Sequence, residues 1–174
     1  AALVDRLIGM DQIDGVADLA EAFPTSVFPN AVGIKMPDSR KLIDYGAMVF
    51  NALGPDNDLR RSIMARAPDI VPWINAQCER QNLTADGVGA AIYAESEAGH
   101  ITDEQAGMLV RSLLSAGVDT TVSGLGNALF CLASNPDQYA QLVANPALAL
   151  ATFEEVLRVT SPVQAFCRTA GMDT

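Results

Sequence analysis

The sequence of 174 residues has few of the residues that usually build metal sites or disulfide frameworks. It contains three cysteines, none of them in a C-x-x-C pair, and a single histidine, His100. An odd number of widely spaced cysteines argues against a disulfide scaffold and favours a reducing, cytoplasmic setting. A zinc site built from these residues would need unusual ligand spacing. We therefore expect no metal ligand within this chain.

Basic residues and long apolar runs are also scarce. Lys and Arg number 11 against 21 Asp and Glu, which gives a formal net charge of −10. Phosphate binding needs Lys and Arg, so this balance excludes nucleic acid as a partner and argues against an anionic membrane surface. The chain has no uninterrupted apolar stretch of about 18 residues, so we expect no transmembrane helix.

What remains is typical of a globular, mainly α-helical protein. Hydrophobic residues make up 49% of the chain and charged residues 18%, and the length is sufficient to bury a core. Pro68 and Pro72 predict a kink or break within the helix that is predicted over 58–82. Apolar periodicity and turn residues predict helices over 39–53, 58–82, 84–98, 103–134, 136–144 and 146–160, and an extended segment over 163–169.

The predicted helix over 103–134 is the most informative segment. Thr102 is a suitable N-cap, and Gln105 completes a capping box. The helix is apolar on nearly all sides, which is typical of a helix in the middle of a large protein. We therefore expect the 174 residues to be an internal piece of a longer chain.

Several residues in the middle of this helix break local rules together. Gly117, Asp119 and the Thr120–Thr121 pair are each unfavourable in an apolar helix interior. Ser112, Ser115, Ala116 and Asp119 share one face. One interpretation is a narrow polar groove that carries a proton donor and a hydroxyl; the other is a packing kink with a paired Asp. Further on, Glu155 and Arg158 have the i, i+3 spacing of an ion pair.

Two motifs resemble those of the cytochrome P450 superfamily, the haem-thiolate monooxygenases. A-G-V-D-T-T at 116–121 matches the oxygen-binding helix motif of that family, and E-V-L-R at 155–158 matches its E-x-x-R motif. The resemblance implies a mainly α fold with short β segments, a partial P450 fold from about the end of helix D to the strand after helix K. The family's cysteine loop, F-x-x-G-x-x-x-C-x-G, is not found, so the haem's thiolate ligand would lie outside this chain. On this reading residues 1–174 are an internal fragment of one P450 domain, without its N-terminal part and its cysteine-ligand loop, and inactive alone.

The resemblance also implies roles for individual residues. Asp119 and Thr120 would be catalytic, relaying protons to dioxygen, while Ala116 and Gly117 would leave room beside the haem. Glu155 and Arg158 would form a buried structural ion pair. Arg168 would pair with a haem propionate. The implied cofactor is haem b (iron protoporphyrin IX), with dioxygen, and with electrons from NAD(P)H delivered by a ferredoxin-type donor.

A finer resemblance is to bacterial enzymes that oxidise para-substituted benzoates such as 4-methoxybenzoate. F-N-A-L-G-P-D-N at 50–57, L-V-R-S at 109–112 and S-P-V-Q at 161–164 carry it. It implies hydroxylation or O-demethylation of a small aromatic acid, with Leu53 standing where these enzymes usually have a second Phe. Arg111 and Ser112 would help to hold the carboxylate. The implied pocket residues are Phe50, Leu53, Ser115, Ala116, Val163 and Phe166.

Two alternatives stay open at this point. One is a haem-thiolate monooxygenase that acts on another substrate, such as a terpene or a fatty acid. The other is a non-catalytic, all-helical interaction module that shares only the helix motifs; it predicts that the isolated chain folds cooperatively without haem.

Overall fold

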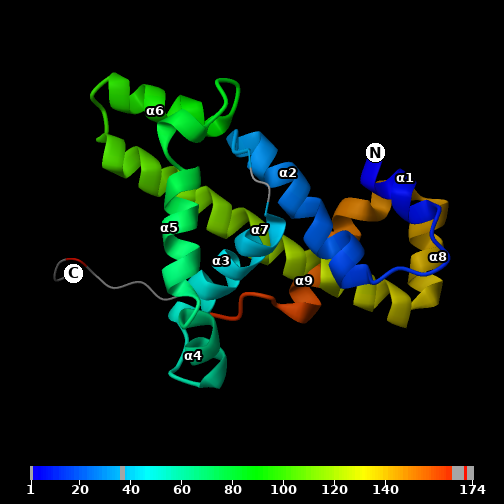
Figure 1. Ribbon diagram of the computed structural model, residues 1–174. Helices are drawn as coiled ribbons and strands as arrows, with labels where there is room; N and C mark the ends of the chain where they lie inside the picture. Colours follow the sequence, from blue (N-terminus) through cyan, green and yellow to red (C-terminus); the bar gives the residue numbers. More distant parts are fainter. Residues whose placement is uncertain (1, 36–37, 166–170, 172–174) are drawn as a thin grey trace. The chain divides into compact units, whose positions relative to one another are not determined.

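The computed structural model describes residues 2–35, 38–165 and 171, which are almost wholly helical (Figure 1). Within these residues, β structure is confined to one isolated antiparallel bridge between Ile34 and Leu83. The mainly α class expected from the sequence is confirmed. The helices are α1 (Ala2–Ile8), α2 (Ala22–Val32), α3 (Ser39–Ala52), α4 (Asp58–Met64), α5 (Ala67–Gln77), α6 (Val88–Glu97), α7 (Asp103–Ser134), α8 (Pro136–Ala144) and α9 (Ala149–Thr160). Shorter turns are the π-helical η1 (Gly15–Glu21) and the 3₁₀ turns η2 (Arg80–Asn82) and η3 (Pro146–Leu148).

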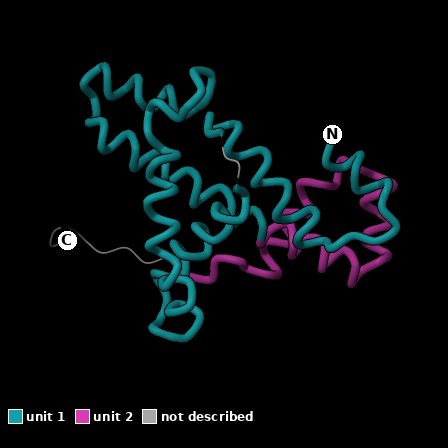
Figure 2. The backbone as a smooth tube through the Cα atoms, viewed as in Figure 1, with its two compact units in different colours: residues 1–122 teal, residues 123–174 magenta. Residues whose placement is uncertain are grey.

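The chain divides into two compact units, residues 1–122 and residues 123–174 (Figure 2). The boundary falls within α7, whose residues as far as Val122 belong to the first unit. No helix among the described residues combines the length and the apolar character needed to cross a membrane.

The long helix α7 begins and ends where the sequence predicts. The Thr102 hydroxyl accepts a hydrogen bond from the Gln105 backbone N–H at 3.1 Å. The Gln105 side chain in turn accepts one from the Thr102 backbone N–H at 2.8 Å. This reciprocal pair satisfies two N–H groups that a helix start otherwise leaves without partners. At the other end, Pro136 opens α8 directly after Asn135.

The predicted helix over 58–82 is broken, as its prolines indicate. α4 ends at Met64, and α5 starts at Ala67 with Pro68 in its first turn, where a missing N–H costs little. Pro72 is accommodated inside α5. The predicted helix over 84–98 starts later, at Val88. Before it, the Thr84 backbone N–H donates to the Gly33 carbonyl at the end of α2, at 2.8 Å. Gly33, at a φ of 93°, ends α2, and a Cβ on Gly87 would lie only 2.4 Å from the Gly33 Cα.

The core of the first unit is built on one stripe of α7. Ala106, Val110, Leu114 and Val118 recur every four residues and are fully buried. Burying a side chain such as Leu or Val stabilises a fold by roughly 1.5–3 kcal/mol, so this stripe fixes α7 firmly. The other core side chains come mainly from α2, α3 and α5: Val32, Ile34, Leu42, Tyr45, Met48, Ile70, Ile74 and Cys78.

The sequence predicted a helix apolar on nearly all sides, and the described residues cover only part of its apolar surface. Met108 and Leu109 are 52% and 45% exposed, and Phe130 near the end of the helix is 71% exposed. Apolar side chains of α7 outside the core stripe therefore remain exposed in the part of the chain that the structure describes.

The second unit packs the end of α7 against α8 and α9. Gly124 of α7 lies against the Phe153 ring of α9, with the ring 3.0 Å from where a Cβ would stand. Asn127 donates a hydrogen bond to the Thr160 hydroxyl at 3.1 Å. Ser161 ends α9 in the left-handed region, at a φ of 43°, immediately before Pro162. The predicted stop at 161–162 is thus confirmed.

Candidate functional site

The segment 116–121 lies within α7 and does not interrupt it. The Thr120 hydroxyl donates to the Ala116 carbonyl, and the Thr121 hydroxyl donates to the Gly117 carbonyl, both at 2.8 Å. These are the i−4 bonds expected of Thr inside a helix. Each hydroxyl has one proton, so the Thr120 oxygen remains able to accept a hydrogen bond but not to donate a second one.

The predicted polar stripe does lie on one face of this helix, away from the core stripe. Ser112 and Ala116 are exposed, whereas Ser115 and Asp119 are half-buried. The Ser112 hydroxyl donates to the Leu109 carbonyl at 2.8 Å, and the Ser115 hydroxyl to the Ser112 carbonyl at 3.0 Å. These serines, like Thr120, use their own protons within the helix. The stripe thus presents acceptor oxygens and an open surface at Ala116.

Asp119 sits against the backbone of α3. A Cβ on Gly46 would lie 3.2 Å from the Asp119 Cβ and 3.8 Å from its Oδ1. Burial raises the pKa of the Asp119 carboxyl above its ordinary value. Among the described residues, no Lys or Arg forms an ion pair with it. The described residues therefore supply no cation with which Asp119 could be paired, as the alternative of a packing kink with a paired Asp would require.

Gly117 is covered by an aromatic ring from α2. A Cβ at this position would lie 2.1–2.4 Å from ring atoms of Phe28. The sequence analysis expected a flat group to approach the small residues 116 and 117. At Gly117 the flat group found in this structure is the chain's own Phe28, and the predicted cofactor-binding role of Gly117 stays a prediction. The exposed Ala116 has no such cover.

The residues predicted to bind substrate are only partly brought together. Phe50 is half-buried near the end of α3, whereas Leu53, just after that helix, is 81% exposed. Arg111 donates to the Asn75 side chain of α5 at 3.0 Å. Val163 is 47% exposed and belongs to the second unit. Phe166 and Arg168 lie outside the described residues, so their predicted roles stay predictions.

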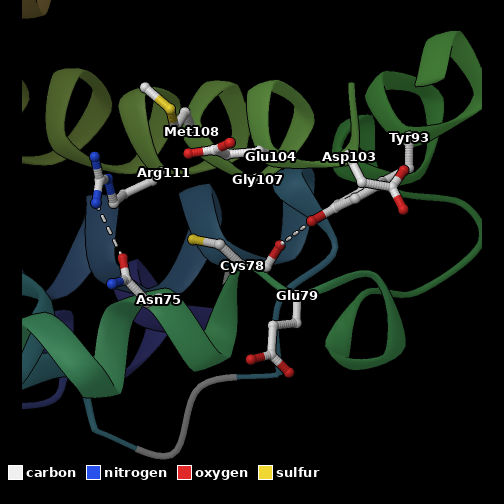
Figure 3. A pocket seen from close by; sticks show the side chains of 9 residues that line it. All are labelled: Asn75, Cys78, Glu79, Tyr93, Asp103, Glu104, Gly107, Met108 and Arg111. Carbon is white, nitrogen blue, oxygen red and sulfur yellow. Dashed lines mark hydrogen bonds between the residues drawn. The ribbon is translucent and has the colours of Figure 1, made fainter. Parts of the chain in front are cut away.

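Arg111 is the one member of that set that lines the pocket in Figure 3. This pocket has a volume of about 460 Å³ and lies between α5, α6 and the first turns of α7. The Tyr93 hydroxyl donates to the Cys78 carbonyl at its base, at 3.0 Å. Burial raises the pKa of the Cys78 thiol to about 12. The remaining lining residues are Asn75, Glu79, Asp103, Glu104, Gly107 and Met108.

Sequence reasoning missed this pocket, and it also missed Phe28 and Gly46. Arg111 and Asn75 are 36 residues apart, and no local pattern indicates that α5 and α7 pack side by side. Gly117 and Gly46 gave a weak signal of these contacts, because a small residue inside a helix often marks a close approach by another element. Which element approaches could not be read from the sequence.

The ion pair predicted between Glu155 and Arg158 forms, but it is not buried. Arg158 donates from Nε and Nη2 to the two carboxylate oxygens at 2.7 and 2.6 Å. These bonds lower the pKa of Glu155 and raise that of Arg158. Their side chains are 57% and 70% exposed in this chain. Glu155 also lines a groove of about 600 Å³ within the second unit, between α7, α8 and α9.

Comparison with known proteins identifies the class. The family model described as cytochrome P450 matches residues 75–152. The chain is 50% identical to cytochrome P450 CYP199A2 of Rhodopseudomonas palustris over 99% of its own length and 42% of that protein. It is 27% identical to cytochrome P450-terp of a Pseudomonas species, again over 99% of the chain and 44% of the relative.

Solved structures agree on the fold. The P450BioI chain from its complex with a fatty-acyl-carrying acyl carrier protein matches with a TM-score of 0.77 at 23% identity, covering 94% of this chain and 43% of that one. Epothilone D-bound P450epoK matches with a TM-score of 0.73 at 24% identity, over 90% and 41% of the two chains. The chain is similar to cytochrome P450s along nearly its whole length. It spans less than half the length of the relatives that it matches.

The residues present fit a haem in part. Ala116 offers an exposed, small side chain at which a flat macrocycle can approach α7, whereas the ring of Phe28 blocks Gly117. Cys78 is buried with a raised pKa, and Cys131 lies in α7, so neither is placed as an open thiolate ligand. Of the described residues, Ala116 and Thr120 are those that would border the haem.

Proposed function

We propose that the protein to which these residues belong is a haem-dependent monooxygenase that activates dioxygen to hydroxylate or O-demethylate a small aromatic acid. The observation that carries this proposal is the pairing of a half-buried acid of raised pKa, Asp119, with an acceptor hydroxyl, Thr120, beside the open surface at Ala116. The similarity to cytochrome P450s supports the reaction class. The benzoate-type segments of the sequence support the substrate class.

Haem b, when bound through a cysteine thiolate, supplies the iron at which dioxygen is reduced with electrons from NAD(P)H by way of a ferredoxin-type donor. This chain supplies proton handling. Burial raises the pKa of the Asp119 carboxyl, so it holds a proton more readily than an exposed Asp does, which suits a group that gives and retakes protons. Since adjacent helix residues do not face each other, the proton would pass from Asp119 toward Thr120 through water.

Thr120 would act as an acceptor. Its own proton is held by the Ala116 carbonyl, so the free lone pairs can anchor a water molecule or the O–H of a protonated ligand over Ala116. Such an anchored donor delivers a proton without letting bulk water into the site. Loss of the anchor would release reduced dioxygen as hydrogen peroxide.

The chain offers a matched control for this role. Thr121 makes the same 2.8 Å bond to its i−4 carbonyl as Thr120 does. In the full-length protein, we expect Thr120→Ala to lower product per NAD(P)H consumed and to raise hydrogen peroxide, while Thr121→Ala stays close to wild type. General acid–base steps contribute ~100-fold or more, so the difference should be large. Equal behaviour of the two variants would mean that both threonines only shape the helix.

The substrate class is tested by the spin-state change of the haem on ligand binding. We expect 4-methoxybenzoate and other 4-substituted benzoates to shift the spectrum of the full-length protein at low concentration. The matched ligand 4-methoxybenzyl alcohol lacks the carboxylate and should bind much more weakly. A response to a terpene or a fatty acid, with none to the benzoates, would overturn the substrate assignment while leaving the reaction class in place.

A further inference from the structure

A close approach between α3 and α7 centres on Gly46. This glycine is buried, and its open side faces Asp119. A Cβ there would lie 3.2 Å from the Asp119 Cβ, 3.8 Å from its backbone N and 3.8 Å from its Oδ1. Carbon atoms in good contact are about 3.5–4.0 Å apart, so even a methyl group would be too close. The bare backbone of α3 is thus the surface on which the Asp119 side chain rests.

Backbone conformation does not explain this glycine. The glycines with positive φ among the described residues are Gly33 and Gly99, and Gly46 lies in the middle of α3 with helical neighbours on both sides. Glycine is unfavourable at such a position because it leaves the unfolded chain more freedom and buries no side chain. The close approach to Asp119 accounts for it.

The helix that carries Gly46 cannot easily move away from α7. Leu42, Tyr45 and Met48 of α3 are buried in the core of the first unit. Two residues before Gly46, the Asp44 side chain is only 4% exposed and accepts a hydrogen bond from Arg66, which follows α4. Because buried side chains hold both α3 and α7, a Cβ added at Gly46 would force a shift of a few tenths of an ångström at this contact, and the Asp119 side chain would move with it.

We propose that Gly46 is a positioning residue for Asp119: the absence of a side chain at Gly46 fixes how deeply the Asp119 carboxyl is seated between α3 and α7. Its functional consequence rests on the proposed function, in which Asp119 relays protons. Adding a methyl group at Gly46 would push that carboxyl toward solvent and away from the water path to Thr120. The proton would then arrive late, and more of the reduced dioxygen would leave as hydrogen peroxide.

Gly107 provides a matched control for the test. It also lies in a helix of the first unit, and a Cβ on it would meet its nearest neighbour, the Tyr93 hydroxyl, at the same 3.2 Å. Gly46→Ala and Gly107→Ala would be made in the full-length holoprotein, each also in an Asp119→Asn background. Three quantities would be measured: the position of residue 119 in crystal structures, the fraction of reducing equivalents recovered as hydrogen peroxide, and the thermal midpoint.

We expect Gly46→Ala to displace the Asp119 carboxyl and to raise the peroxide fraction by roughly threefold or more, since a misplacement of about 1 Å can cost ~100-fold in rate. Gly107→Ala should change neither. In the Asp119→Asn background, Gly46→Ala should add nothing to the peroxide fraction, because a positioning residue acts only through the group that it positions.

An unmoved Asp119 in Gly46→Ala, or an equal rise of peroxide in the Asp119→Asn background, would overturn the proposal. So would a peroxide rise in Gly107→Ala that matches that of Gly46→Ala. If the wild-type protein oxidised no substrate at all, the proposed function would fail, yet the crystal structures would still decide whether Gly46 positions Asp119.

Discussion

Substituting Gly117 tests the packing of Phe28 on the oxygen-binding segment of α7. A Cβ at Gly117 would lie 2.1 Å from the nearest ring atom of Phe28, so the ring would have to withdraw by about 1.4 Å to reach an ordinary carbon contact. Overpacking of this kind costs about 1–3 kcal/mol. Replacing glycine by alanine in a helix interior stabilises the helix by up to about 1 kcal/mol, which offsets part of this cost. We therefore expect Gly117→Ala to lower the free energy of unfolding by ~1–2 kcal/mol.

A double-mutant cycle separates the clash from other effects. Once Phe28→Ala has removed the ring, Gly117→Ala should become neutral or stabilising, which gives a coupling energy of about 2 kcal/mol between the two positions. Gly126→Ala is the control on the same helix, because a Cβ there meets nothing within 4 Å; it should stabilise by up to about 1 kcal/mol.

The assay is urea unfolding of the full-length holoprotein and its variants, followed by far-UV circular dichroism and by the haem absorbance. The reasoning would be refuted if Gly117→Ala were as stable as Gly126→Ala. It would equally be refuted if the cost of Gly117→Ala were unchanged after Phe28→Ala, since the ring would then not be its cause.

Three further predictions concern charge and thiol chemistry. Burial raises the pKa of Asp119 above 3.8, so its ionisation at neutral pH opposes folding. Asp119→Asn should therefore raise the thermal midpoint at pH 7, and this gain should shrink toward zero as the pH falls toward 4. A gain that grew in acid would contradict the assigned shift. Arg66→Ala removes a partner of the buried Asp44 and should lower the free energy of unfolding more than Arg61→Ala does, because the partners of Arg61 are exposed. Equal losses in urea unfolding would count against a special role for Asp44. Cys78 is 3% exposed, and burial raises the pKa of its thiol to about 12. Peptide mapping after maleimide treatment at pH 8 should therefore find Cys78 unmodified in the native protein and modified in urea. Rapid labelling of the native protein would show that the pocket beside α5 opens.

Local chemistry explains which parts of the fold could be predicted. The capping box at Thr102 and Gln105, the break before Pro68 and the stop at Ser161 depend on residues close together in the sequence. The polar stripe of Ser112, Ser115, Ala116 and Asp119 on one face of α7 follows from the helical repeat. Each of these features is set by the backbone and its nearest side chains, so a single sequence was sufficient.

The contacts that shape the candidate site join residues far apart in the sequence. Phe28 of α2 covers Gly117, and the α3 backbone at Gly46 supports Asp119. No local sequence pattern indicates which helix packs against which. Arg111 illustrates the same limit, since its partner is Asn75 on α5. The i, i+3 spacing predicted the pair of Glu155 and Arg158, but how far a pair is buried depends on whatever packs over the helix.

The central claim is that the Asp119–Thr120 segment serves the oxidation of a small aromatic acid. Its most direct test is product analysis of the full-length protein with 4-methoxybenzoate, NADH, a ferredoxin and a ferredoxin reductase. The account predicts 4-hydroxybenzoate and formaldehyde in equal amounts. A protein that shows the thiolate-type spectrum of its reduced carbon monoxide complex, but forms neither product from this substrate or any other 4-substituted benzoate, would contradict it.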